Sequence, residues 1–168
     1  MKWLMLACAL VAMSWPAPVT AQPAGIDTLI VPGERIGPIR LGMDQDEVIR
    51  ILGKPNYVQN MDEVGEYMHI YGPRNFLRGW LTVTYKRAIA PTVQSLLTGS
   101  LSGVFVTERG IRVGSPGPRV VQVYGPPDKE QCDTDSSGGC AAYYNSGILF
   151  VVPFSLGRVD RIIVTPPK

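Results

Sequence analysis

Histidine and cysteine are scarce in this chain, and their scarcity excludes several classes of enzyme. His69 is the only histidine, and the cysteines number three. A single histidine cannot build a two-histidine metal site, and a Ser-His-Asp triad would have to use this one residue. The sequence also lacks a Gly-x-Ser-x-Gly motif and a glycine-rich phosphate loop. We therefore predict a protein that is not an enzyme and that holds no cofactor.

Charged residues and long apolar runs are also few. The chain has 16 lysines and arginines against 14 aspartates and glutamates, and it has no block of basic residues. Nucleic acids and anionic lipid surfaces attract basic patches, so this near-neutral balance argues against either as the main partner. After Ala21 no stretch is long and apolar enough to span a bilayer, and we expect no transmembrane segment in the mature chain.

The segment from Met1 to Ala21 has the order of features that is typical of a secretory signal. Lys2 supplies a positive start, Leu4 to Trp15 form a short apolar run, and small residues precede Gln22. Only five apolar residues separate Lys2 from Cys8, which is too few for the apolar region of a lipoprotein signal. We predict export to a bacterial periplasm or to the exterior, with cleavage near Ala21.

Two cysteines remain once Cys8 leaves with the signal. Cys132 and Cys140 flank a polar loop that contains glycine, and an oxidising compartment favours disulfides. Their separation by seven residues differs from that of a redox-active Cys-x-x-Cys motif. We predict a structural disulfide between them that joins the two sides of a hairpin.

The loop between these cysteines also resembles the start of a calcium-binding loop. Asp133, Asp135 and Ser137 occupy the first, third and fifth positions of such a loop, and Gly138 occupies the sixth. Tyr144 stands where a bidentate glutamate is required. Acidic residues, serine and glycine are equally typical of a solvated hairpin tip. A weak calcium site at Asp133, Asp135 and Ser137 is therefore one of two interpretations.

One stretch of the sequence occurs twice. The segments 39–55 and 111–127 share six landmarks at one constant offset along the chain, which indicates an internal repeat. Each copy predicts a short helix with a narrow apolar stripe. Asp44 caps the first predicted helix and Ser115 the second, and a glycine ends each of them.

Alternating apolar residues predict three strands after each helix. The fold class that we predict is α+β, with two tandem repeats of one helix and three antiparallel strands, and with the helices packed on one face of a curved sheet. Repeat unit 1 covers residues 26–98, a junction covers 99–103, and repeat unit 2 covers 104–168, although the two units can also form one fused domain. The expected strands are 66–71, 80–85, 93–98, 141–145, 147–152 and 158–164.

The phrase IGPIRLGMDQDEVIRILGKP, followed by three strands rich in aromatic residues, resembles the SmpA/OmlA-type outer-membrane assembly lipoprotein domain. The β-lactamase inhibitor protein family shares this fold in tandem form, and the resemblance covers most of residues 36–164 in two copies. Members of these families are not catalytic and act by contacting other proteins. The resemblance therefore implies a non-catalytic, protein-binding role for this chain.

Four residues are candidates for a binding surface. If the helices cover Met68 and Ile70, then Tyr67, His69, Tyr71 and Trp80 project from the opposite, open face as an aromatic contact surface. The alternative is that some of these rings belong to the core and that His69 is merely a surface residue, because alternation does not tell which face the helix covers.

The function that we predict is binding, through the open sheet face, to another exported protein or a cell-envelope component. A second hypothesis is an inhibitor of an exported hydrolase. A third is a small hydrolase, which would require a carboxylate within hydrogen-bond reach of His69.

Overall fold

Residues 27–72, 81–99, 103–133 and 138–168 are described by the structure, a computed structural model of the chain. The predicted signal, with Cys8, and residues 100–102 of the predicted junction lie outside these ranges. Within the described ranges, none of the helices has the length and apolar character needed to cross a membrane.

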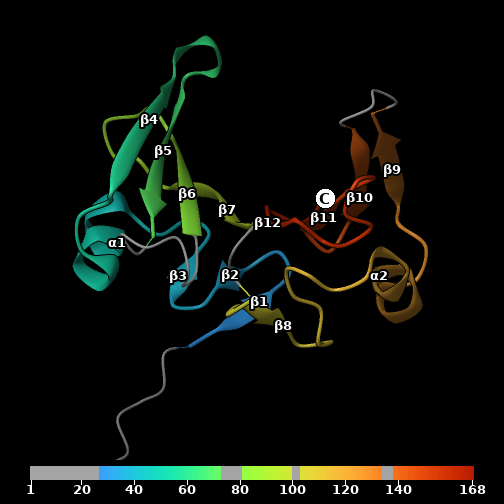
Figure 1. Cartoon of the computed structure of the whole chain (residues 1–168). Helices are drawn as coiled ribbons and strands as arrows, with labels where there is room; N and C mark the ends of the chain where they lie inside the picture. The colour runs from blue at the N-terminus through green and yellow to red at the C-terminus, as the bar shows by residue number, and fades with distance from the viewer. Residues whose placement is uncertain (1–26, 73–80, 100–102, 134–137) are drawn as a thin grey trace, which may run out of the picture.

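Eight strands form one large antiparallel sheet, whose two ends rise above its middle in Figure 1. The halves of the sheet come from the first and second parts of the chain, and they meet where β7 pairs with β12. The order across the sheet is β4 (Tyr57–Met61), β5 (Glu66–Tyr71), β6 (Leu81–Lys86), β7 (Val93–Gly99), β12 (Arg161–Val164), β11 (Ile148–Pro153), β10 (Gly139–Tyr144) and β9 (Lys129–Cys132).

A smaller four-stranded sheet lies beneath the large one in Figure 1. Its strands have only two or three residues each, and β1 pairs in parallel with β8 whereas the other pairs are antiparallel. Their order is β3 (Ile39–Arg40), β2 (Arg35–Ile36), β1 (Leu29–Val31) and β8 (Val106–Thr107). A short 3-10 helix, η1 (Asp62–Val64), connects β4 to β5.

Two helices of eight residues each, α1 (Gln45–Leu52) and α2 (Gly117–Tyr124), confirm the two helix predictions. Asp44 caps α1 as expected, because its carboxylate accepts the Glu47 backbone N–H at 2.7 Å. The predicted cap of α2 is wrong. Helix α2 begins one residue after Pro116 and has no side-chain cap, while the Ser115 hydroxyl accepts the Arg112 backbone N–H instead.

The predicted fold class is wrong. In the described residues the chain is mostly β: four strands of the large sheet follow each helix rather than three, and a second sheet accompanies the large one. The strands that we missed in the large sheet are β4 and β9. All their residues except Met61 are exposed, so they lack the apolar alternation that reveals a half-buried strand. The arrangement is therefore not two units of one helix and three strands with helices laid on a curved sheet.

A continuous apolar core lies on one side of the large sheet. It takes in one residue from each helix, Val48 and Val120, together with isoleucines of the small sheet. The helices and the small sheet therefore cover the same face, which we call the covered face. Buried residues that the large sheet contributes to it include Val83, Tyr85, Leu96, Ile148, Phe150, Ile162 and Val164.

Gly147 and Gly33 bring the loop after β1 against the turn between β10 and β11. The Gly33 backbone N–H donates to the Gly147 carbonyl at 3.2 Å, and the Thr165 backbone N–H donates to the same oxygen at 3.0 Å. Gly147 has a φ of 84°, which disfavours any residue with a Cβ. A Cβ added there would lie 2.6 Å from the Gly33 Cα, so the contact also has no space for one.

We expect Gly147→Ala to lower the free energy of unfolding by about 2 kcal/mol or more, since it adds both backbone strain and a backbone clash. Urea unfolding followed by circular dichroism measures this change. Gly103→Ala is the matched control, because a Cβ at Gly103 meets no atom within 4 Å. Equal stability of the two variants would contradict the close approach.

Candidate binding surface

The residues proposed for an open aromatic surface lie on the covered face. His69 is 4% exposed, Tyr71 is 8% exposed and Tyr67 is half-buried. Trp80 lies outside the described residues. The cross-strand pairs of β5 with β6 show the reason, since each ring lies opposite a core residue: Tyr67 with Tyr85, His69 with Val83, and Tyr71 with Leu81.

The two faces of β5 were therefore assigned in reverse. The hypothesis put Met68 and Ile70 of β5 on the covered side, whereas the register puts them on the face opposite to the buried Leu81 and Val83 of β6. The alternative interpretation is right that some rings belong to the core, since Tyr71 is part of it and Tyr67 packs against it, but it is wrong about His69, which is buried rather than on the surface. In these positions Tyr67, His69 and Tyr71 cannot form an open contact surface.

Tyr67, His69, Tyr71 and Tyr85 form a packed ring cluster beside helix α1. The rings of Tyr67 and Tyr85 stack with centroids 5.2 Å apart, and the His69 ring meets the Tyr85 ring edge-on at 4.9 Å. The Tyr67 hydroxyl donates to Gln45 Oε1 at 2.6 Å, which ties the ring cluster to the first turn of the helix. The cluster thus fixes α1 on the sheet.

Burial sets the protonation of the ring cluster. It lowers the pKa of His69 below its usual value of 6.5, because a buried imidazolium loses its hydration. It raises the pKa of Tyr85 and of Tyr71 for the same reason, since burial disfavours the phenolate. His69 Nδ1 lies 3.5 Å from the Tyr71 hydroxyl. The histidine that a small hydrolase would need is thus packed among tyrosines in the core.

The opposite side of the large sheet, which we call the open face, carries a row of paired residues across all eight strands. Each member lies directly opposite the next in the strand register, and apolar or aromatic side chains make up most of the row. We call this the open row: Tyr57, Ile70, Thr82, Leu97, Ile163, Leu149, Tyr143 and Lys129.

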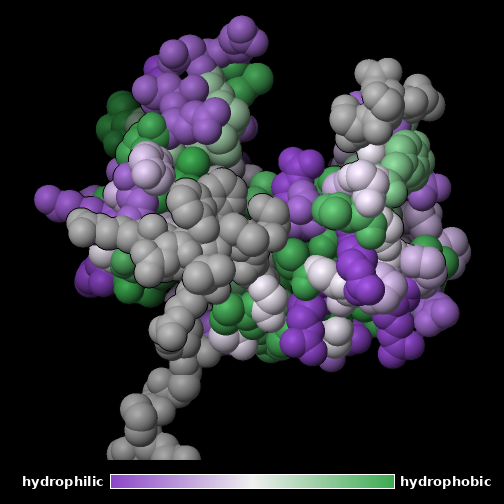
Figure 2. Space-filling view, in the orientation of Figure 1, coloured by the Kyte–Doolittle hydropathy of each residue, from purple (hydrophilic) through white to green (hydrophobic). Residues whose placement is uncertain are grey.

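The buried Thr82 divides the open row into two accessible parts, and the longer part runs from β7 across β12, β11 and β10 to β9. Thr82 is only 4% exposed, whereas Leu97, Ile163, Leu149 and Tyr143 are all partly exposed. The Lys129 ammonium lies 5.5 Å from the centre of the Tyr143 ring, a cation–π contact at the end of the row. In Figure 2, hydrophobic and hydrophilic residues are interspersed on the visible side of this part of the molecule. The row therefore offers an apolar strip with a charged end.

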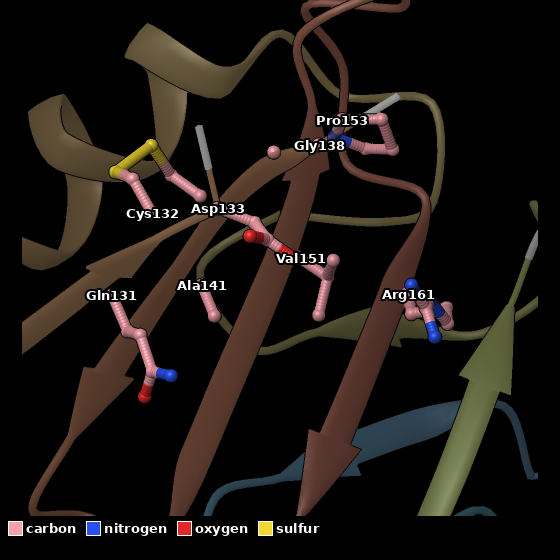
Figure 3. Close-up of a pocket in the computed structure, with 10 residues that line it drawn as sticks. Gln131, Cys132, Asp133, Gly138, Ala141, Val151, Pro153 and Arg161 are labelled. Atoms are coloured by element: carbon pink, nitrogen blue, oxygen red, sulfur yellow. A yellow bond between two sulfur atoms is a disulfide. The ribbon is translucent and has the colours of Figure 1, made fainter. Parts of the chain in front are cut away.

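A hollow of about 360 Å³ borders the open row on the same face. Figure 3 shows Gln131 and Asp133 on one side of it, Arg161 on the other, and Val151 between them. The Arg161 Nε pairs with the Asp160 carboxylate at 3.3 Å, and half of the Arg161 side chain remains exposed. The hollow thus presents both signs of charge around an apolar floor.

The predicted disulfide is confirmed: Cys132 and Cys140 are bonded and lie directly opposite each other on β9 and β10. Of the calcium candidates, only Asp133 lies within the described residues, and it lines the hollow. Asp135 and Ser137 lie outside them, so the calcium site stays a prediction. The disulfide holds the edge strand β9 to the sheet.

Comparison with known proteins gives a likeness of fold. No protein-family model matches the sequence, and no curated protein matches it. A cysteine-rich secretory protein from Staphylococcus aureus subsp. aureus Mu50 is similar in structure, with a TM-score of 0.52 and 14% identity over 80% of this chain and 48% of that chain.

Two further structures are similar to the same degree. An extracellular protein containing an SCP domain from Bacillus anthracis strain Ames has a TM-score of 0.51 and 8% identity over 75% of this chain and 44% of that chain. A DUF4309 family protein from Bacillus subtilis subsp. subtilis strain 168 has a TM-score of 0.51 and 13% identity over 73% of this chain and 78% of that chain.

This chain thus spans about half the length of the first two structures. Identities this low show a shared fold and no more. None of the three is described as an SmpA/OmlA-type domain or a β-lactamase inhibitor protein, so that resemblance stays a prediction.

The open-face residues Leu149, Ile163 and Arg161 were missed as functional candidates. Their strands were predicted, but nothing in the sequence says which alternate set faces the core. The sequence of β11 did contain one indication of which face is buried. Phe150, the largest side chain of the strand, alternates with Leu149 and Val151, and the structure buries Phe150 completely.

We predict that the free energy of unfolding falls as the pH drops below 6.5, and that His69 causes this fall. Above pH 6.5 His69 is neutral in both states; below it the unfolded chain takes up a proton that the folded chain resists. The slope is at most about 1.4 kcal/mol per pH unit for one proton. Urea unfolding between pH 8 and about pH 5 measures it. His69→Gln is the control, and a variant that keeps the same slope in this window would contradict the assignment.

Replacing both disulfide cysteines with serine should lower the free energy of unfolding by up to about 2.6 kcal/mol, because a closed nine-residue loop no longer restricts the unfolded chain. Thermal unfolding of the double variant Cys132→Ser, Cys140→Ser tests this. Reduction of the native protein by a dithiol should have the same effect and should leave the double variant unchanged. If neither the double substitution nor the reduction lowers the free energy of unfolding, the disulfide does not contribute to stability.

Proposed function

We propose that this chain is an exported, non-catalytic protein that binds another protein through the part of its open face that runs from β7 to β9. The observation that carries the proposal is the longer accessible part of the open row. Leu97, Ile163, Leu149 and Tyr143 form a partly exposed apolar strip on a surface backed by the whole core. An apolar centre with a polar rim is the composition of a protein–protein interface.

The charges around the strip favour a protein over a polyanion as the partner. Arg161 and Asp133 line the same hollow and Lys129 lies at the end of the open row, so both signs of charge occur on this face. Nucleic acids and anionic lipids are bound by clusters of basic side chains. A protein surface that offers both apolar and charged groups matches this mixture.

Export is supported by the N-terminal sequence and by the disulfide. A signal-like segment precedes the described residues, and disulfides such as Cys132–Cys140 persist in oxidising compartments. Two of the similar structures are described as a secretory and an extracellular protein. The absence of catalysis is supported by the position of His69 inside the ring cluster.

Leu149→Glu should weaken capture of the partner at least about tenfold, which corresponds to about 1.4 kcal/mol, because the interface would bury an unpaired carboxylate. Chemical cross-linking in the cells that produce the protein, followed by affinity purification and mass spectrometry, identifies the partner. Its affinity for each purified variant is then measured by calorimetry.

Val121→Glu is the matched control for this experiment. Val121 lies on α2, away from the open face, and its side chain is 47% exposed, so the same change adds a carboxylate where no contact is proposed. Both variants should keep the thermal midpoint of the native protein to within a few degrees. A partner bound equally well by both variants would refute the open-face proposal.

A further inference from the structure

The two edges of the large sheet differ in how they are protected. Within the described residues, β4 pairs only with β5, and β9 pairs only with β10, so each leaves one row of backbone groups unpaired. Proteins usually guard such edges with charged side chains, lysine above all, because an open edge recruits another strand. Strand β9 carries Lys129 and Glu130 and is fixed by the disulfide at Cys132.

Strand β4 has none of these protections. Its five residues, from Tyr57 to Met61, carry no charge and include no proline. Tyr57 is 68% exposed and Val58 is 56% exposed, so apolar side chains are accessible at this free edge. Figure 1 shows β4 at the outer limit of the sheet, beyond β5. An uncharged edge of this length with exposed apolar side chains is a template for pairing.

The sequence of β4 also complements itself. If two copies pair in antiparallel fashion with Gln59 opposite Gln59, Tyr57 of each copy lies opposite Met61 of the other. This arrangement buries exposed apolar surface without placing like charges together. Beyond the strand it brings Lys54 of each copy toward the end where the exposed Glu63 of the other copy lies. Such a self-complementary contact is what a two-fold symmetric dimer requires.

We infer that two copies of this chain form a dimer by antiparallel pairing of their β4 strands, which joins the two large sheets into one. The pairing satisfies the free backbone groups of both β4 edges and leaves β9 as the guarded edge at each end. This surface is separate from the strip over β7, β10, β11 and β12 in the proposed function, so either proposal can hold without the other.

Sedimentation equilibrium of the purified protein tests this inference. The native chain should show a concentration-dependent mass that reaches twice that of one chain. Gln59→Lys should raise the dimer dissociation constant roughly tenfold or more, because two ammonium groups would face each other at the two-fold axis. Gln131→Lys is the matched control, since it places the same charge on the exposed strand at the other edge, and this variant should remain a dimer.

A second variant with the opposite charge at residue 59 keeps the inference testable if Gln59→Lys is poorly folded. Gln59→Glu should weaken the dimer as Gln59→Lys does, whereas a mixture of the two should associate, because each lysine then faces a glutamate. A native chain that stays monomeric at every concentration overturns the inference. So does a dimer that Gln59→Lys leaves unchanged, or a mixture that does not associate.

Discussion

The pairing of β7 with β12 is the interaction on which the rest of the architecture depends. The two strands lie far apart in the chain, yet four residue pairs join them, from Gly99 with Arg161 to Leu96 with Val164. Without this contact the first and second parts of the chain would form two separate small sheets. Closing so long a loop costs conformational entropy, which the shared core on the covered face offsets. Gly99 helps, because a Cβ there would lie 2.9 Å from the Arg161 Cγ.

The two faces of the joined sheet have different roles: the covered face stabilises the fold, and the open face is available for binding. On the covered face the ring cluster, the helices and the small sheet supply the buried apolar contacts that hold the fold together. The open face contributes little to that core, so its side chains are free to serve contact with other molecules. A single register shift would exchange the two sets, because the side chains of a strand alternate. The register between β5 and β6 therefore decides which residues are structural.

Local patterns in the sequence were sufficient for the two helices, for six strands of the large sheet and for the disulfide. Asp44 caps its helix as its spacing predicts, and Cys132 bonds to Cys140. The small sheet was not predictable, since strands of two or three residues are too short to show a period. Strands β4 and β9 were missed for a related reason: an edge strand exposed on both faces has no apolar alternation.

What the sequence by itself determined is the local structure, because caps, turn glycines and alternation act over a few residues. Only the tertiary structure decided that Tyr67 and His69 belong to the core and that Leu149 and Ile163 face outward. Alternation divides the side chains of a strand into two sets, one on each face. It does not show which of the two sets is buried. That choice belongs to the strand register and to the helix that packs on one side. Both are fixed by contacts between residues far apart in the chain.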